Sequence, residues 1–163
     1  MVNAGETLRA PLPAIPIKMK THEEKVRPIA ICLCRDNDRI LVSEFREKDR
    51  LYYRSLGGTI EFGEHAEESI RREFQEEISA DLTELRYLGM LENIYTHKGL
   101  RGHEIVLVYD GRLTDTSLYK MEVIQGNELG TPLKAVWKRL DEFDPELSPV
   151  YPEGLLALLN SLR

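Results

Sequence analysis

Residues Gly58–Glu77 read GTIEFGEHAEESIRREFQEE and give the strongest indication of the fold. The second half of this stretch predicts an α-helix over 66–78, because apolar residues recur there every four positions and form a stripe along one side. The stripe consists of Ala66, Ile70, Phe74 and Ile78. A glycine-containing segment therefore leads into an amphipathic helix, and the charges on that helix decide what the segment does.

Three carboxylates of the expected helix, on Glu73, Glu76 and Glu77, fall within an arc of about 100° at the edge of the apolar stripe. Like charges three and four residues apart repel each other on a helix. A divalent cation would relieve this repulsion, and ligands that are all oxygen indicate Mg²⁺ or Mn²⁺ rather than Zn²⁺. The alternative is a solvated acidic face, with Glu76 paired to Arg72.

The segment before the helix favours the metal site over the solvated face. Glycines at 57, 58 and 63 would let a ligand or metal approach the backbone closely. Glu64 lies just before the helix, where it can cap the helix or pair with Arg72. Together these residues would form a cradle for a metal and a phosphate.

Residues 58–80 resemble the Nudix box, whose pattern is Gly, five residues, Glu, seven residues, then Arg-Glu-apolar-x-Glu-Glu-x-Gly-apolar. The matching positions are Gly58, Glu64, Arg72, Glu73, Phe74, Glu76, Glu77 and Ala80. Ser79 stands where the pattern has Gly, which usually ends the helix with a positive φ, so the following loop is expected to differ slightly. A looser similarity extends over residues 26–160.

The resemblance implies an α+β fold, the α/β/α sandwich of the Nudix family, with a mixed central sheet flanked by the box helix and a C-terminal helix. It also implies that Glu73, Glu76 and Glu77 bind the metal. A backbone carbonyl near Gly57 or Gly58 would add a ligand, and Arg72 and Glu64 would support the carboxylates.

Members of the family often recruit one more carboxylate from outside the box, as a base or a further ligand. We expect Glu104 in this role, because it shares a strand face with Val106 and Val108 and should point inward. Glu92 is the other candidate. The expected catalytic residues are Arg72, Glu76, Glu77 and Glu104, and the expected substrate-binding residues are Arg54, Tyr95 and Arg101.

The implied reaction is divalent-metal-dependent hydrolysis of a diphosphate linkage in a nucleoside diphosphate joined to another moiety. Water would attack phosphorus, the metal would lower the pKa of that water, and a carboxylate would accept its proton. The alternative is a Nudix-like sensing or regulatory domain without turnover, which would not need the full carboxylate set. A prenyl-diphosphate-type isomerase is disfavoured, because Cys32 and Cys34 are wrongly placed for it and are expected to be buried structural residues.

Outside the box, alternation and turn residues predict several strands. The expected strands are Val26–Cys34, Arg39–Glu44, Leu51–Leu56, Leu82–Tyr95 with a break near Gly89, His103–Leu113 and Ala135–Leu140. Residues 45–50 and 96–102 are expected to be loops, and Lys98 and Arg101 of the second loop would close over ligand phosphates. A variable connection covers 114–133, and leucines within 152–163 predict a closing helix.

The chain of 163 residues fits one domain, which we place at 25–163, after an N-terminal arm at 1–24 that is extended or partly disordered. The net charge of −6, with dispersed Lys and Arg, indicates a small nucleotide-like ligand rather than a nucleic-acid polymer. The longest apolar runs, such as Ile105–Tyr109, are too short to cross a bilayer. We expect a cytoplasmic protein without a membrane partner, and a homodimer is compatible with the sequence.

Overall fold

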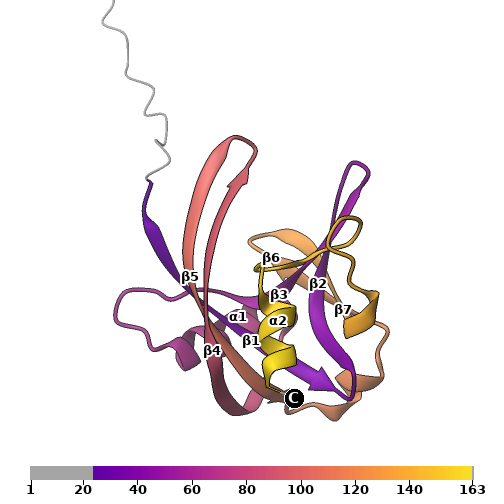
Figure 1. Ribbon diagram of the computed structural model, residues 1–163. Coiled ribbons are helices and arrows are strands. Elements are labelled where there is room, and N and C mark those ends of the chain that lie inside the picture. Colours follow the sequence, from indigo (N-terminus) through magenta and orange to yellow (C-terminus); the bar gives the residue numbers. More distant parts are fainter. Residues whose placement is uncertain (1–23, 163) are drawn as a thin grey trace, which may run out of the picture.

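The computed structural model of the chain describes residues 24–162, so the arm predicted at 1–24 lies outside the described residues except for its last position. A mixed β-sheet lies between two helices, one on each face (Figure 1). The elements are β1 (Val26–Asp36), β2 (Arg39–Glu47), β3 (Arg50–Thr59), α1 (Ala66–Ile78), β4 (Leu82–His97), β5 (Leu100–Leu113), β6 (Val123–Glu128), β7 (Thr131–Arg139), β8 (Val150–Tyr151) and α2 (Leu155–Ser161). Short 3₁₀ helices cover Thr116–Lys120 and Leu140–Glu142.

The strand order is β4-β5-β1-β3-β2-β7-β6, with β8 added alongside β3. The β1–β5 and β3–β8 pairs are parallel and the remaining pairs are antiparallel. This mixed sheet with helices on both faces confirms the predicted α+β architecture. The pairing of Ala30 with Gly58, and of Ile31 with Gly57, places the glycine pair of the box directly beside β1.

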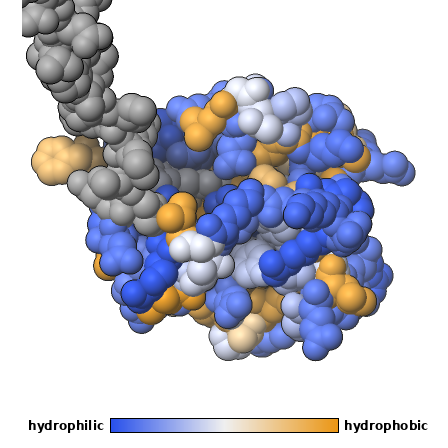
Figure 2. Space-filling view, turned by 90° about the horizontal axis from the view of Figure 1, so that it is seen from above, coloured by the Kyte–Doolittle hydropathy of each residue, from blue (hydrophilic) through white to orange (hydrophobic). Residues whose placement is uncertain are grey.

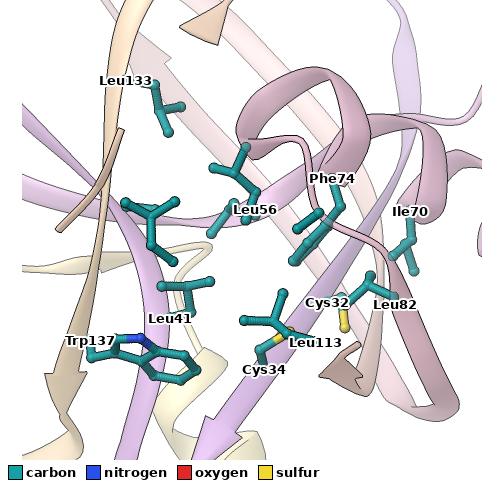
Figure 3. Packing of buried hydrophobic residues seen from close by; sticks show 14 of the residues in the cluster. Cys32, Cys34, Leu41, Leu56, Ile70, Phe74, Leu82, Leu113, Leu133 and Trp137 are labelled. Atoms are coloured by element: carbon teal, nitrogen blue, oxygen red, sulfur yellow. The ribbon is translucent and has the colours of Figure 1, made fainter. Parts of the chain in front are cut away.

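Two apolar clusters fill the space between the sheet and the helices. On the α1 side, Ile70 and Phe74 of the helix pack with Leu56 and Trp137 of the sheet (Figure 3). Cys32 and Cys34 are fully buried in this cluster as free thiols, as predicted. On the other side, the leucines of α2 pack on the faces of β1, β2 and β5. The box helix is therefore fixed against the sheet along its apolar stripe.

Helix α1 has the predicted bounds, 66–78. The backbone N–H of His65 donates to the Glu68 carboxylate at 2.8 Å, which satisfies a donor at the helix start. At the other end, Ser79 has φ 52° and ψ 40°, and its N–H donates to the Gln75 carbonyl at 3.1 Å. Ser79 thus adopts the left-handed conformation that glycine has in the box pattern, at a cost of about 1 kcal/mol.

The loops predicted at 45–50 and 96–102 are wrong, because strands occupy most of both segments. In the first, only residues 48–49 turn between β2 and β3, and in the second only residues 98–99 turn between β4 and β5. Lys48, Lys98 and Gly99 have positive φ, which two-residue hairpin turns require. Charged side chains on these exposed strand ends conceal the alternation that normally marks a strand.

The connection predicted over 114–133 contains strand β6, which was not predicted, and β7 begins before its expected start. The closing helix is shorter than predicted, since it begins only after Gly154, which has φ 86°. The expected break near Gly89 is present as a register shift between Tyr87 and Gly89.

Figure 2 shows the face at the tips of the β2–β3 and β4–β5 hairpins. This face is mainly hydrophilic, and its hydrophobic residues lie in small groups. Within residues 24–162, every helix is too short or too polar to cross a membrane.

Candidate active site

The end of β3 lets carboxylates of α1 lie against the strand backbone. The N–H of Gly57 donates to Oε2 of Glu77 at 3.2 Å. A Cβ at Gly58 would come closer than 3.0 Å to the Glu73 carboxylate, and a Cβ at Gly57 would collide with the β1 backbone at Ala30. Gly57 therefore permits a close approach of β3 to β1 that a side chain would prevent, and Gly58 leaves room for the Glu73 carboxylate beside the strand.

Glu77 is a buried acid, with 7% of its surface exposed. Burial raises its pKa to about 8, and the nearby charges of Glu128 and Glu73 act in the same direction. The Gly57 N–H and the charge of Arg54 oppose this shift only partly. A carboxylate so poorly compensated is stable in its charged form only if a cation approaches it.

Arg72 is the centre of an ion-pair network at the start of the site. Its guanidinium donates to Glu64 at 2.8 and 3.0 Å, to Glu73 at 2.6 Å and to the Thr59 carbonyl at 3.0 Å. Hydrogen bonding from Arg72 lowers the pKa of Glu64 to about 2. Glu64 also accepts the Glu61 N–H at 3.0 Å, so these bonds connect the box loop to the helix.

The three carboxylates expected to bind metal differ in their surroundings. Glu77 is buried, the Glu73 side chain is 18% exposed, and the Glu76 side chain is 58% exposed and lies 3.4 Å from Arg72. In the part of the chain that the structure describes, no three acidic, histidine or cysteine side chains are grouped closely enough to hold a metal ion. Because Arg72 binds Glu73 at 2.6 Å, a cation would have to compete with Arg72 for this carboxylate.

The donor chemistry nevertheless fits a hard divalent cation. Glu73 and Glu77 both face the glycine pair, where backbone oxygens lie close by, and the charge of Glu77 lacks a full partner. Carboxylate and carbonyl oxygens are the ligands that Mg²⁺ and Mn²⁺ prefer.

Glu128 of β6 is a carboxylate of this site that the sequence analysis missed. A Cβ at Gly126 would come closer than 3.0 Å to the Glu77 carbonyl, so β6 packs tightly on the last turn of α1. Two residues later, Glu128 lines a small pocket together with Glu77 and Gly57. The sequence signal for this position, a glycine two residues before an acid, is weak because it lies in a segment predicted to be a connection.

Glu104, the predicted carboxylate from outside the box, lies in a different cluster. It accepts hydrogen bonds from Arg27, from Asn93 at 3.0 Å and from Tyr95 at 3.0 Å. Glu104 shares a strand face with Val106 and Val108 and is buried, as predicted. This face packs under α2, so the structure does not bring Glu104 together with the carboxylates of α1.

The other predicted residues are spread over the same hairpin. Glu92, the alternative carboxylate, lies 2.8 Å from His103 on the exposed surface. Arg101 is exposed on β5 opposite Thr96 and is part of a strand, not of a mobile loop. Lys98 at the turn binds Glu47 at 2.8 Å.

Arg54 is the predicted substrate residue that the structure brings to the box carboxylates, since it lines the pocket that contains Glu77 and Glu128. Tyr95, by contrast, lies in the Glu104 cluster, with its ring packed across Gly102. The expected site therefore divides into a box cluster and a separate cluster on the β4–β5 hairpin.

Comparison with known proteins points to one family. The chain is similar in fold to a MutT NUDIX hydrolase from Burkholderia pseudomallei, with a TM-score of 0.62 and 19% identity over 86% of this chain and 100% of that one. It is also similar to the MutT protein from Bacillus halodurans (TM-score 0.56, 20% identity, 84% of this chain and 82% of that one). The E. coli ORF135 protein has a TM-score of 0.54 and 18% identity, over 85% of this chain and 91% of that one.

A search of the curated proteins finds no match. The family model of the NUDIX domain matches residues 25–155, which span the glycine pair, the box helix and β6. With the box residues in register and the sheet and helices in place around them, the chain belongs to the Nudix family.

Proposed function

We propose that this protein hydrolyses a diphosphate linkage in a nucleoside diphosphate joined to another moiety, and that it requires Mg²⁺ or Mn²⁺. The observation that carries the proposal is the buried Glu77 carboxylate, which lies against Gly57 and beside Glu128 with its charge incompletely compensated. In a structural role such a group would only destabilise the fold, whereas at a metal site it is useful.

Each residue of the site has a proposed role that follows from its position. Glu73, Glu76 and Glu77 would hold the cation together with a backbone oxygen at Gly58, and Glu128 takes the place of Glu104 as the carboxylate from outside the box. When bound, the cation offsets phosphate charge and lowers the pKa of the attacking water. Arg72 and Glu64 keep the box loop and helix in register.

The chemical step is the attack of water on a phosphorus atom of the linkage. A new P–O bond forms to the water oxygen, the bridging P–O bond breaks, and the water proton passes to a carboxylate. Glu128 is the candidate for this proton acceptor, because it lies beside Glu77 and is not one of the three carboxylates assigned to the cation. The products are two fragments that each carry phosphate.

A substrate panel with Mg²⁺ or Mn²⁺ tests this proposal. Nucleoside triphosphates, nucleotide sugars, dinucleoside polyphosphates and dinucleotide cofactors would be incubated in ¹⁸O-water. We expect at least one substrate to yield two phosphorylated fragments, or pyrophosphate from a triphosphate, with the label on a phosphoryl group. Binding without turnover across the whole panel would indicate a sensing domain, and label on carbon would exclude the reaction.

A further inference from the structure

A small pocket on strands β2 and β3 opens beside the box carboxylates. It is lined by Ser43, Phe45, Arg54, Ser55, Gly57, Glu77 and Glu128. Its volume of about 10 Å³ is room for a single water-sized atom, such as one oxygen of a larger group. The pocket cannot hold an aromatic ring or a sugar, so any ligand that enters it does so with one small polar atom.

One hydroxyl group of this pocket is buried without a hydrogen-bond partner among the described residues. It belongs to Ser43, which is 2% exposed. The Oγ atom of Ser55 is also unpaired, but Ser55 pairs with Val42 and its side chain lies on the opposite face of the sheet. Buried hydroxyls are almost always paired, because desolvation without a hydrogen bond costs stability. The unpaired Ser43 hydroxyl at the edge of the site therefore indicates a hydrogen-bond partner that arrives from outside.

Arg54 is held at the rim of the same pocket. It pairs in register with Ser43 across β2 and β3, so both side chains lie on one face of the sheet. The Arg54 guanidinium lies 5.7 Å from the centre of the Phe45 ring. Phe45 is itself stacked on Tyr52, with ring centres 5.3 Å apart and planes 11° apart. The aromatic pair thus forms a rigid support for a planar cation.

The geometry points to a phosphate subsite in which Arg54 and Ser43 bind one phosphoryl group of the substrate and Phe45 positions Arg54. This inference rests on the proposed function and identifies which group of the substrate meets β2 and β3. A guanidinium and a hydroxyl are both donors, and phosphate oxygens are acceptors that guanidinium binds in a planar fork. One phosphate oxygen also matches the size of the pocket.

Binding of inorganic pyrophosphate in the presence of Mg²⁺, measured by calorimetry, tests the subsite apart from turnover. We expect Arg54→Ala to raise Kd about tenfold or more, and Arg54→Lys to raise it nearly as much, because lysine keeps the charge but loses the fork. Ser43→Ala should raise Kd several-fold. The control is Arg46→Ala, which removes an exposed arginine one residue from Phe45 on the opposite face and should change Kd less than twofold.

A double-mutant cycle tests the positioning role of Phe45. Phe45→Leu should weaken pyrophosphate binding several-fold in the wild-type background and leave it unchanged in the Arg54→Ala background. An equal loss in both backgrounds would show that Phe45 does not act through Arg54. Unfolding temperatures of all variants, measured without ligand, separate loss of binding from loss of folding, and Arg54→Lys supplies a second variant if Arg54→Ala fails to fold.

The outcomes separate the subsite from the proposed function. If the wild-type protein turns over a diphosphate but Arg54→Lys and Ser43→Ala bind pyrophosphate as the wild type does, the subsite is wrong and the hydrolase remains. Tight pyrophosphate binding that depends on Arg54, without turnover of any substrate, would support the subsite and reject the hydrolase. A wild-type protein that does not bind pyrophosphate would reject the subsite.

Discussion

At the scale of single residues, the site depends on the Glu77 carboxylate, which is buried where its negative charge is poorly compensated. Glu77 is buried beside two other acids and accepts a hydrogen bond from the Gly57 N–H at 3.2 Å. Burial raises its pKa from the ordinary 4.5 to about 8, so the folded chain binds this proton more tightly than the unfolded chain does.

The sign of the resulting pH dependence follows from linkage. A raised pKa contributes stability that is fully present below about pH 4.5 and is lost as the pH rises through about 8. In chelator, the wild-type protein should lose on the order of a few kcal/mol across this window, since each pKa unit is worth about 1.4 kcal/mol. Glu77→Gln should lose clearly less, as measured by urea unfolding at pH 5, 7 and 9. Identical slopes for both proteins would show that Glu77 is not the titrating group.

The sequence predicted that the box residues lie together, but it did not predict which residues from other elements lie beside them. Arg72, Glu73 and Glu77 lie on one helix, so local periodicity is enough to group them. Glu128 and Ser43 join the site only through the packing of β6 on α1 and the register of β2 with β3, which no local pattern encodes. Glu104 lies on the predicted strand face, but alternation shows only that this face is buried and not which helix covers it.

At the scale of elements, the end of β3 combines two glycines that serve different purposes. Gly57 has φ 129° and lies against the β1 backbone, whereas Gly58 lies against the flexible end of the Glu73 side chain. The bounds of helix α1 were predicted correctly, because its end signals and its apolar stripe lie within the helix sequence itself. The hairpin turns and β6 were missed because short polar strand ends acquire their structure from pairing with neighbours.

Alanine substitutions should separate the two glycines. Gly57→Ala forces a strained backbone into contact with Ala30 and should destabilise the protein by about 2 kcal/mol or more. Gly58→Ala should cost less stability, because Glu73 can move, but should weaken Mg²⁺ binding about tenfold. Thermal unfolding and Mg²⁺ titration of both variants check this. Equal effects of the two variants on both measurements would contradict the assignment.

At the scale of the whole molecule, the fold brings acidic residues together in a protein that is already negative overall, with a net charge of −6. Acids from α1 and β6 converge beside β3. A divalent cation that binds this arrangement only in the folded state must stabilise the whole domain.

Magnesium should therefore raise the unfolding temperature. At a concentration about 100 times its Kd, a ligand adds about 2.7 kcal/mol, which corresponds to an increase of roughly 5–10 °C for a domain of this size. Differential scanning calorimetry with MgCl₂, and with NaCl of equal ionic strength as the control, measures this increase. The increase should be lost in Glu77→Gln. An equal response to both salts would indicate general screening and not a site.

We propose that the box carboxylates serve metal-dependent chemistry and not the fold, and one paired measurement on Glu77→Gln tests this most directly. Thermal unfolding in EDTA and turnover at saturating Mg²⁺ would be followed on the same samples, with the wild type beside them. We predict an unfolding temperature in EDTA no lower than that of the wild type, together with a loss of turnover of about a hundredfold or more. An unfolding temperature far below the wild type, with near-normal turnover of the folded remainder, would contradict the claim.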